Sequence, residues 1–148
     1  MKNKVVEKYF SNFALINTEG MDAFAREQSK LLSPNLVAST TDYRGTRTEY
    51  GIDGFFRGLE DWSKHFRSNH HSPKEFLEDT PTRVSVRGLN RLGLVVPVNG
   101  RTVSEEDEHE WTEEFEVAPD GLITKVHVSV ISHRQRDWSP WRVSAKDL

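Results

Sequence analysis

Apolar residues in the first half of the chain recur three or four positions apart, the spacing of one face of a helix. This pattern predicts a helix over residues 4–16 and a second over 21–32, which Pro34 ends. Residues 36–43 are rich in valine and threonine and are typical of a short strand, and a polar loop with two glycines follows them. A third, clearer apolar stripe runs over residues 52–66.

The second half of the chain alternates apolar and polar positions, which predicts strands. Asn99-Gly100 is a strong hairpin signal, and Pro119-Asp120-Gly121 indicates a second turn. The predicted strands lie near residues 84–86 and over residues 92–98, 101–117 and 123–132. Two helices, a strand, a helix and a meander of long strands make an α+β domain.

The long strand over residues 101–117 has one charged face and one mixed face. Its even-numbered positions carry a row of glutamates, whereas its odd-numbered positions include Trp111 and Phe115. Residues two apart share a face, so we expect the glutamates in solvent and the odd face inward. Asp107, His109 and Glu113 share that inward face. Because a packed core excludes unpaired carboxylates, these three residues predict a cavity or an open edge of the sheet.

The register of the final hairpin decides which residues join them. A three-residue loop would pair Glu113 with His127 as an acid–base dyad, but it would place Val126, Val128 and Val130 beside the solvated glutamates. A loop one residue longer or shorter reverses this. Burying three valines, at about 1.5–3 kcal/mol each, outweighs a turn preference. We therefore predict the register that buries the valines and leaves His127 out of the site.

Composition excludes several classes of protein. The 148 residues suit a single domain, and the net charge of −3 comes with scattered Lys and Arg, so we expect no nucleic-acid partner. No apolar stretch is long enough to span a membrane, and with no signal sequence at the start a cytoplasmic location is expected. There is no cysteine. The domain is predicted over residues 1–132, and Trp138 and Trp141 suggest that the tail, residues 133–148, packs on the domain or on a second copy.

Five strings, in order along the chain, resemble the SnoaL-like polyketide cyclase branch of the nuclear transport factor 2-like superfamily. They are VEKYFSNF, LSPNLVAST, GIDGFFRGLEDW, PVNGRTV and FEVAPDGLITKV. The resemblance implies a cone-shaped, curved mixed or antiparallel sheet wrapped around three N-terminal helices, the cystatin-like roll, with a pocket inside and a homodimeric assembly. The superfamily includes cyclases, isomerases, dehydratases, epoxide hydrolases and binding modules, so the fold alone does not give one reaction.

Ketosteroid isomerase, in the same superfamily, is the nearest mechanistic comparison. By this resemblance Tyr9 matches its first-helix tyrosine, and Glu113 matches the strand acid that donates a hydrogen bond to an oxyanion. The base of that enzyme falls at Thr40, which cannot accept the proton. Asp42, two residues on and on the same face, is the candidate replacement, although it also fits a plain turn residue.

The candidate catalytic residues are therefore Asp42, His109 and Glu113, because a carboxylate and an imidazole in one dry pocket can supply acid–base catalysis. His109 also fits a structural histidine. The candidate substrate-binding residues are Tyr9, Phe56, Trp62, Trp111, Phe115, Val126 and Val128. His70-His71 is expected in an exposed loop after the third helix. We expect no metal and no cofactor, since no nucleotide fingerprint is present and strand spacing spreads the acidic residues apart.

The leading hypothesis is a cofactor-independent cyclase, isomerase or dehydratase that acts on a small hydrophobic, polyketide-like or terpenoid-like molecule. Two alternatives stay open from the sequence. One is a non-catalytic binding or assembly module that uses the same pocket, and the other is a hydrolase that activates a water.

Overall fold

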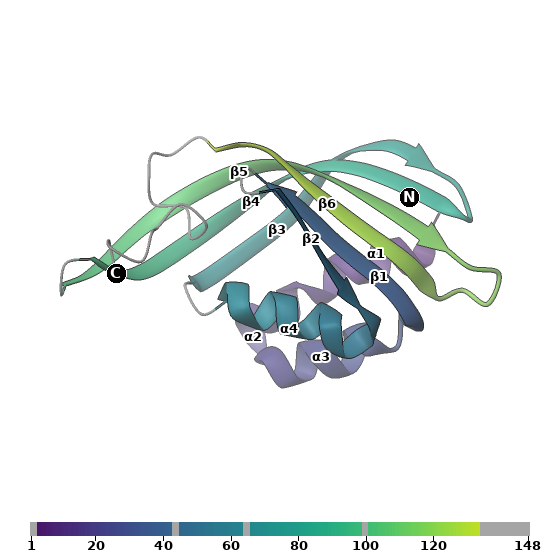
Figure 1. Cartoon of the computed structure of the whole chain (residues 1–148), viewed down its shortest axis with the longest axis horizontal. Helices are drawn as coiled ribbons and strands as arrows, with labels where there is room; N and C mark the ends of the chain where they lie inside the picture. Colours follow the sequence, from purple (N-terminus) through teal and green to yellow (C-terminus); the bar gives the residue numbers. More distant parts are fainter. Residues whose placement is uncertain (1–2, 43–44, 64–65, 99–100, 134–148) are drawn as a thin grey trace.

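The computed structural model describes the backbone of residues 3–42, 45–63, 66–98 and 101–133, and side chains within 3–41, 45–59, 71–89 and 110–130. Six strands form one sheet in the order β2-β1-β6-β5-β4-β3. The sheet curves over the helices, which all lie on its concave side (Figure 1). This arrangement is the predicted α+β fold, with a curved mixed sheet around N-terminal helices.

The helices are α1 (Lys4–Asn12), α2 (Ala14–Thr18), α3 (Met21–Ser29) and α4 (Gly51–Ser63). The strands are β1 (Leu32–Asp42), β2 (Gly45–Tyr50), β3 (Phe66–Asp79), β4 (Arg83–Val98), β5 (Arg101–Val117) and β6 (Ile123–His133). β1 and β6 pair in parallel, and every other neighbouring pair is antiparallel.

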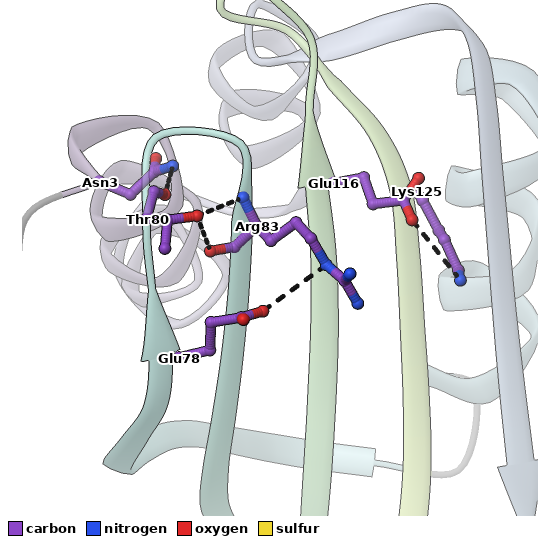
Figure 2. Close-up of polar contacts among 6 residues, drawn as sticks. All are labelled: Asn3, Glu78, Thr80, Arg83, Glu116 and Lys125. Atoms are coloured by element: carbon purple, nitrogen blue, oxygen red, sulfur yellow. Dashed lines mark hydrogen bonds and ion pairs between the residues drawn. The ribbon is translucent and has the colours of Figure 1, made fainter.

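Asn3 fixes the start of α1. Its side-chain oxygen accepts a hydrogen bond from the Val6 backbone N–H at 3.1 Å, as a helix N-cap does. Its side-chain nitrogen donates to the carbonyl oxygens of Thr80 at 3.0 Å and Pro81 at 3.3 Å, in the turn between β3 and β4. Figure 2 shows the contact of Asn3 with Thr80 beside the Thr80–Arg83 hydrogen bonds that close the turn. One residue therefore both caps α1 and attaches it to the sheet.

The core is an aromatic layer between α1 and the concave face. The rings of Tyr9 and Phe115 meet edge to face with centroids 5.0 Å apart, and Phe10 meets Phe115 in the same way at 5.5 Å. Such edge-to-face contacts are the preferred geometry of aromatic pairs. Among the described side chains, the buried apolar residues are Val6, Tyr9, Phe10, Phe13, Phe24, Leu32, Leu36, Phe55, Val84, Val86, Trp111, Phe115, Val117, Ile123 and Val126.

The predicted registers of both C-terminal hairpins are confirmed. Val98 pairs with Arg101 across the first turn. In the second hairpin the three valines of β6 lie opposite inward residues of β5: Phe115 pairs with Val126, Glu113 with Val128 and Trp111 with Val130. Trp111, Glu113 and Phe115 are buried, whereas Glu114 and Glu116 are exposed. The inward face of β5 is therefore the one that the alternation predicts.

Four element predictions are wrong. The helix predicted over residues 4–16 is two helices that meet at Phe13, and the one predicted over 21–32 ends at Ser29, because Leu32 begins β1. The segment 45–50, expected as a loop, is strand β2. The third helix, expected to fray near Asn69, ends at Ser63, and the segment 66–79 is strand β3.

A further difference between the prediction and the structure lies in β4, at Gly88. The sequence suggests two strands on either side of it, whereas β4 runs unbroken from Arg83 to Val98. A glycine inside a strand weakens it without ending it, and it often marks a close approach of another group.

No helix in the described part of the chain is long and apolar enough to cross a membrane. The tail predicted to pack on the domain or on a partner, including Trp138 and Trp141, lies outside the described residues, except that His133 completes β6.

Candidate functional site

A cavity of about 150 Å³ lies between the concave face and the helices. Its walls come from α1, α4, β1, β2, β3, β5 and β6. The lining residues are Tyr9, Phe13, Ala38, Ser39, Thr40, Arg47, Glu49, Phe55, Gly58, Leu59, His71, Trp111, Glu113, Val126, Val128 and Val130. Charged residues of the exposed strand β2 stand at one end, and a buried polar group stands at the other.

The buried polar group is a pair formed by His71 and Glu113. His71 extends from β3 across β4 to β5, where its Nε2 atom lies 2.8 Å from Oε1 of Glu113. Only 9% of the His71 side chain and none of the Glu113 side chain is exposed. When Glu113 is ionised the imidazole N–H donates to the carboxylate, a hydrogen bond strengthened by charge. This contact gives a buried carboxylate the partner that it needs.

Tyr9 of α1 lies beside this pair. Burial raises the pKa of the Tyr9 hydroxyl well above its usual value, and the neighbouring Glu113 carboxylate adds to the rise through its charge and a side-chain hydrogen bond. The hydroxyl therefore stays protonated at neutral pH and remains a hydrogen-bond donor. Tyr9, His71 and Glu113 bring a phenol, an imidazole and a carboxylate to one end of an apolar cavity.

Aromatic rings hold the imidazole in place. The His71 ring stacks on Trp111 with centroids 4.2 Å apart and planes 13° from parallel. Phe10 stacks against the same ring at 5.7 Å, and Phe13 lies against it at 4.9 Å. Packing on several sides restricts the rotation of the imidazole and keeps Nε2 directed at Glu113.

Two buried polar atoms of the site have no hydrogen-bond partner within the described residues: Oε2 of Glu113 and Nε1 of Trp111. Leaving such an atom unsatisfied costs about 1–3 kcal/mol. One is an acceptor when Glu113 is ionised, and the other can only donate. The buried end therefore holds one unsatisfied donor and, when Glu113 is ionised, one unsatisfied acceptor.

Five of the residues predicted from the sequence lie together at this cavity: Tyr9, Trp111, Glu113, Val126 and Val128. Two others, Phe56 and Phe115, are not among the residues that line it. Phe56 packs against Phe24 and Phe55, and Phe115 packs against Tyr9 and Phe10. Both are large apolar side chains that complete the core behind the cavity wall.

The side chains of Asp42, Trp62 and His109 lie outside the described residues. In the backbone, Asp42 pairs with Gly45 at the end of β1, and His109 pairs with Asn90 of β4 and His133 of β6. Among the side chains that are described, no three acidic or histidine residues come together as metal ligands.

His71 is the main residue that the sequence prediction missed, since it was expected in an exposed loop. Pro73 bars a continuation of the third helix, but β3 is an edge strand, where a proline costs no ladder hydrogen bond. Three register shifts also break the alternation of β3. Arg47 and Glu49, from the other edge strand, were missed for a similar reason, because β2 is almost wholly exposed.

No family model and no curated protein sequence matches the chain. Solved structures do. An NTF2-like protein of unknown function from Burkholderia pseudomallei K96243 is 20% identical, with a TM-score of 0.60 over 88% of this chain and 92% of that one. A protein from Shewanella denitrificans OS-217, described as a SnoaL-like polyketide cyclase, is 12% identical, with a TM-score of 0.63 over 88% and 90%.

The Mycobacterium tuberculosis protein RV0760c, solved in complex with estradiol-17beta-hemisuccinate, is 10% identical, with a TM-score of 0.65 over 86% of this chain and 91% of that one. At these identities the similarity concerns the fold. The arched sheet, the helices on its concave side and the neighbours together show that the chain has the NTF2-like fold, which proteins described as SnoaL-like polyketide cyclases share.

Proposed function

We propose that this chain is a cofactor-independent enzyme that moves a proton on a small, largely apolar cyclic molecule, in a cyclisation, isomerisation or dehydration. The observation that carries the proposal is the buried contact between His71 Nε2 and Glu113 Oε1, 2.8 Å apart at the inner end of an apolar cavity. An imidazole and a carboxylate in such a position are suited to accept a proton at one atom and return it at another.

Each side chain has a role in this proposal. The His71–Glu113 pair takes the proton from carbon next to a carbonyl group. Tyr9 gives up its hydrogen bond to Glu113 and donates instead to the oxygen on which negative charge develops, and its raised pKa keeps that donor protonated. Val126 and Val128 press on the apolar body of the substrate and exclude water, which strengthens the electrostatic interactions inside the cavity.

The size of the cavity limits the substrate. Its volume of about 150 Å³ is similar to that of engineered apolar cavities that bind benzene. One ring of the substrate would fill it, and any larger portion would extend toward Arg47 and Glu49 at the exposed end. Proteins of the same fold that are described as polyketide cyclases, and the complex of RV0760c with a steroid ester, support a cyclic ligand.

Deuterium exchange tests the proposal without knowledge of the natural product. Small cyclic ketones in D₂O are incubated with the protein, and the loss of their α-proton signals is followed by NMR. We expect the wild-type chain to accelerate the exchange and Glu113→Gln to slow it about 10²–10⁴-fold, the usual contribution of an acid–base group. Glu114→Gln, on the opposite face of β5, is the matched control. Equal rates for wild type and Glu113→Gln would rule out this role.

A second candidate is a non-catalytic binding module, which one observation favours. Glu49, the other carboxylate of the lining, is 3.7 Å from Arg57 at the exposed end. Glu113 is therefore the one described carboxylate at the buried end, and it has no second carboxylate beside it to share the work of an acid and a base. A binding module predicts that a ligand raises the melting temperature of Glu113→Gln as much as that of the wild type, with no exchange catalysed by either.

A further inference from the structure

Gly88 lies in the middle of β4, directly between two neighbours in the sheet. Its partner on one side is Trp111 of β5, and its partner on the other is Pro73 of β3. Gly88 is buried. Its φ angle is not positive, unlike those of Gly20, Gly45, Gly51 and Gly121. Backbone conformation therefore does not require glycine at position 88, and the reason has to be space.

The space that a side chain would need is taken. A Cβ atom on Gly88 would lie 2.7 Å from Cη2 of Trp111, and it would lie closer still to Cζ2 of the same ring and to the carbonyl oxygen of Ser72. Real Cβ atoms essentially never come within 3.0 Å of another heavy atom. The indole of Trp111 thus lies over the bare backbone of Gly88.

The same indole also stacks on the imidazole of the site. Trp111 stacks on His71 at 4.2 Å, and Phe10 stacks against Trp111 at 5.9 Å. Trp111 is 2% exposed, so its ring is enclosed by these neighbours and by the cavity that it lines. A methyl group on Gly88 would move the indole, and the imidazole stacked on it would then lose its alignment with Glu113.

We propose that Gly88 is a positioning residue, whose missing side chain seats the Trp111 indole so that the indole holds the His71 imidazole on the Glu113 carboxylate. Whether Gly88 positions His71 does not depend on the reaction that the site catalyses. Its consequence for catalysis rests on the proposed proton transfer, because a misplacement of about 1 Å can lower a rate about 10²-fold.

The test follows the imidazole N–H proton of His71 by NMR in the full chain. A buried N–H that donates to a carboxylate exchanges slowly and gives a separate low-field signal. We expect Gly88→Ala to lose this signal together with the ring-to-ring contacts between His71 and Trp111. Ser85→Thr is the matched control: it also adds one methyl group to β4, three residues away, and it should retain both.

A second background separates the indole from the backbone. Trp111→Phe removes the outer edge of the indole, so adding Gly88→Ala to this variant should change the His71 signal much less than in the wild type. Recovery of folding in that double variant, if Gly88→Ala alone does not fold, would support the inference in the same way. An equal loss in both backgrounds, failure of both to fold, or a retained signal in Gly88→Ala would overturn it.

The catalytic consequence is measured separately as deuterium exchange into a ketone. Gly88→Ala should lower kcat about 10²-fold with little change in KM. Absence of exchange in the wild type would contradict the proposed function, while the NMR result would still decide whether Gly88 positions His71. A normal kcat in a Gly88→Ala protein that has lost the His71 signal would contradict the catalytic part alone.

Discussion

The two faces of the sheet each carry a histidine near a glutamate of β5, yet their surroundings differ. On the concave face, His71 meets the fully buried Glu113 among aromatic rings. On the convex face, His127 is half-buried and lies across from the exposed Glu114. Its two ring nitrogens face the hydroxyls of Ser39 at 2.5 Å and Ser129 at 3.2 Å.

The difference shows that burial, more than residue type, decides what such a pair can do. Charged pairs of the convex face, such as Glu116 with Lys125 at 4.0 Å and Glu78 with Arg83 at 3.6 Å, lie near water (Figure 2). Exposed pairs like these contribute roughly 0–1 kcal/mol. The His71–Glu113 pair lies where water does not screen it. Removing one partner should therefore lower the free energy of unfolding, and the pair is the better placed of the two for proton transfer.

The largest expected effect is on stability when Glu113 is removed. Glu113→Ala should lower the free energy of unfolding by roughly 3 kcal/mol, because it leaves a cavity and takes the partner from a buried imidazole. Glu114→Ala, one residue away on the convex face, should change it by less than about 0.5 kcal/mol. Urea denaturation measures both values. Similar losses for the two variants would mean that the faces are equivalent.

Replacement of the whole pair should recover most of that loss. Buried ion pairs can often be exchanged for apolar residues of similar volume at no cost to stability. We expect His71→Phe combined with Glu113→Leu to unfold within about 1 kcal/mol of the wild type, again in urea, and to have no exchange activity. A double variant as unstable as Glu113→Ala would show that the polar pair is needed for folding.

Alkaline pH should separate the buried tyrosine from an exposed one. In the unfolded chain a tyrosine ionises near pH 10, but the raised pKa of Tyr9 keeps it protonated in the fold. Stability is therefore unaffected by Tyr9 below that pH and falls above it, by up to about 1.4 kcal/mol per pH unit. Tyr9→Phe should remove this component of the slope. Tyr50→Phe, at a side chain that is 72% exposed, should leave it in place.

The smallest effect is expected at His127. His127→Asn should lower the free energy of unfolding by about 0.5–1 kcal/mol, the net value of an ordinary hydrogen bond in a half-exposed position. It should leave the exchange rate unchanged, since His127 does not line the cavity in the described part of the chain. A loss of unfolding free energy as large as that of Glu113→Ala would show that His127 is as important to the fold as the buried pair, which contradicts the comparison.

The central strands could be predicted from the sequence because their two faces differ. Val126 and Val128 alternate with polar residues, and burying them fixes the register of the last hairpin. The inward position of Glu113 followed from the same alternation. These are the strands on which a shift by one residue would move every apolar side chain into water.

The edge strands could not be predicted in this way. β2 buries almost nothing, and β3 contains Pro73 and three register shifts, so neither shows the alternation of a half-buried strand. The partner of Glu113 was missed with them, because His71 is brought to the site only by the pairing of β3 with β4. That contact depends on the assembled sheet, which local sequence does not encode.

The central claim is that proton transfer belongs to the concave pair, and the most direct test compares the two histidines. The rate of deuterium incorporation into a cyclic ketone is measured for His71→Asn and His127→Asn under the same conditions. We predict a fall of about 10²-fold or more for the first variant and no change for the second. Equal rates for His71→Asn and the wild type, or a fall confined to His127→Asn, would contradict this account.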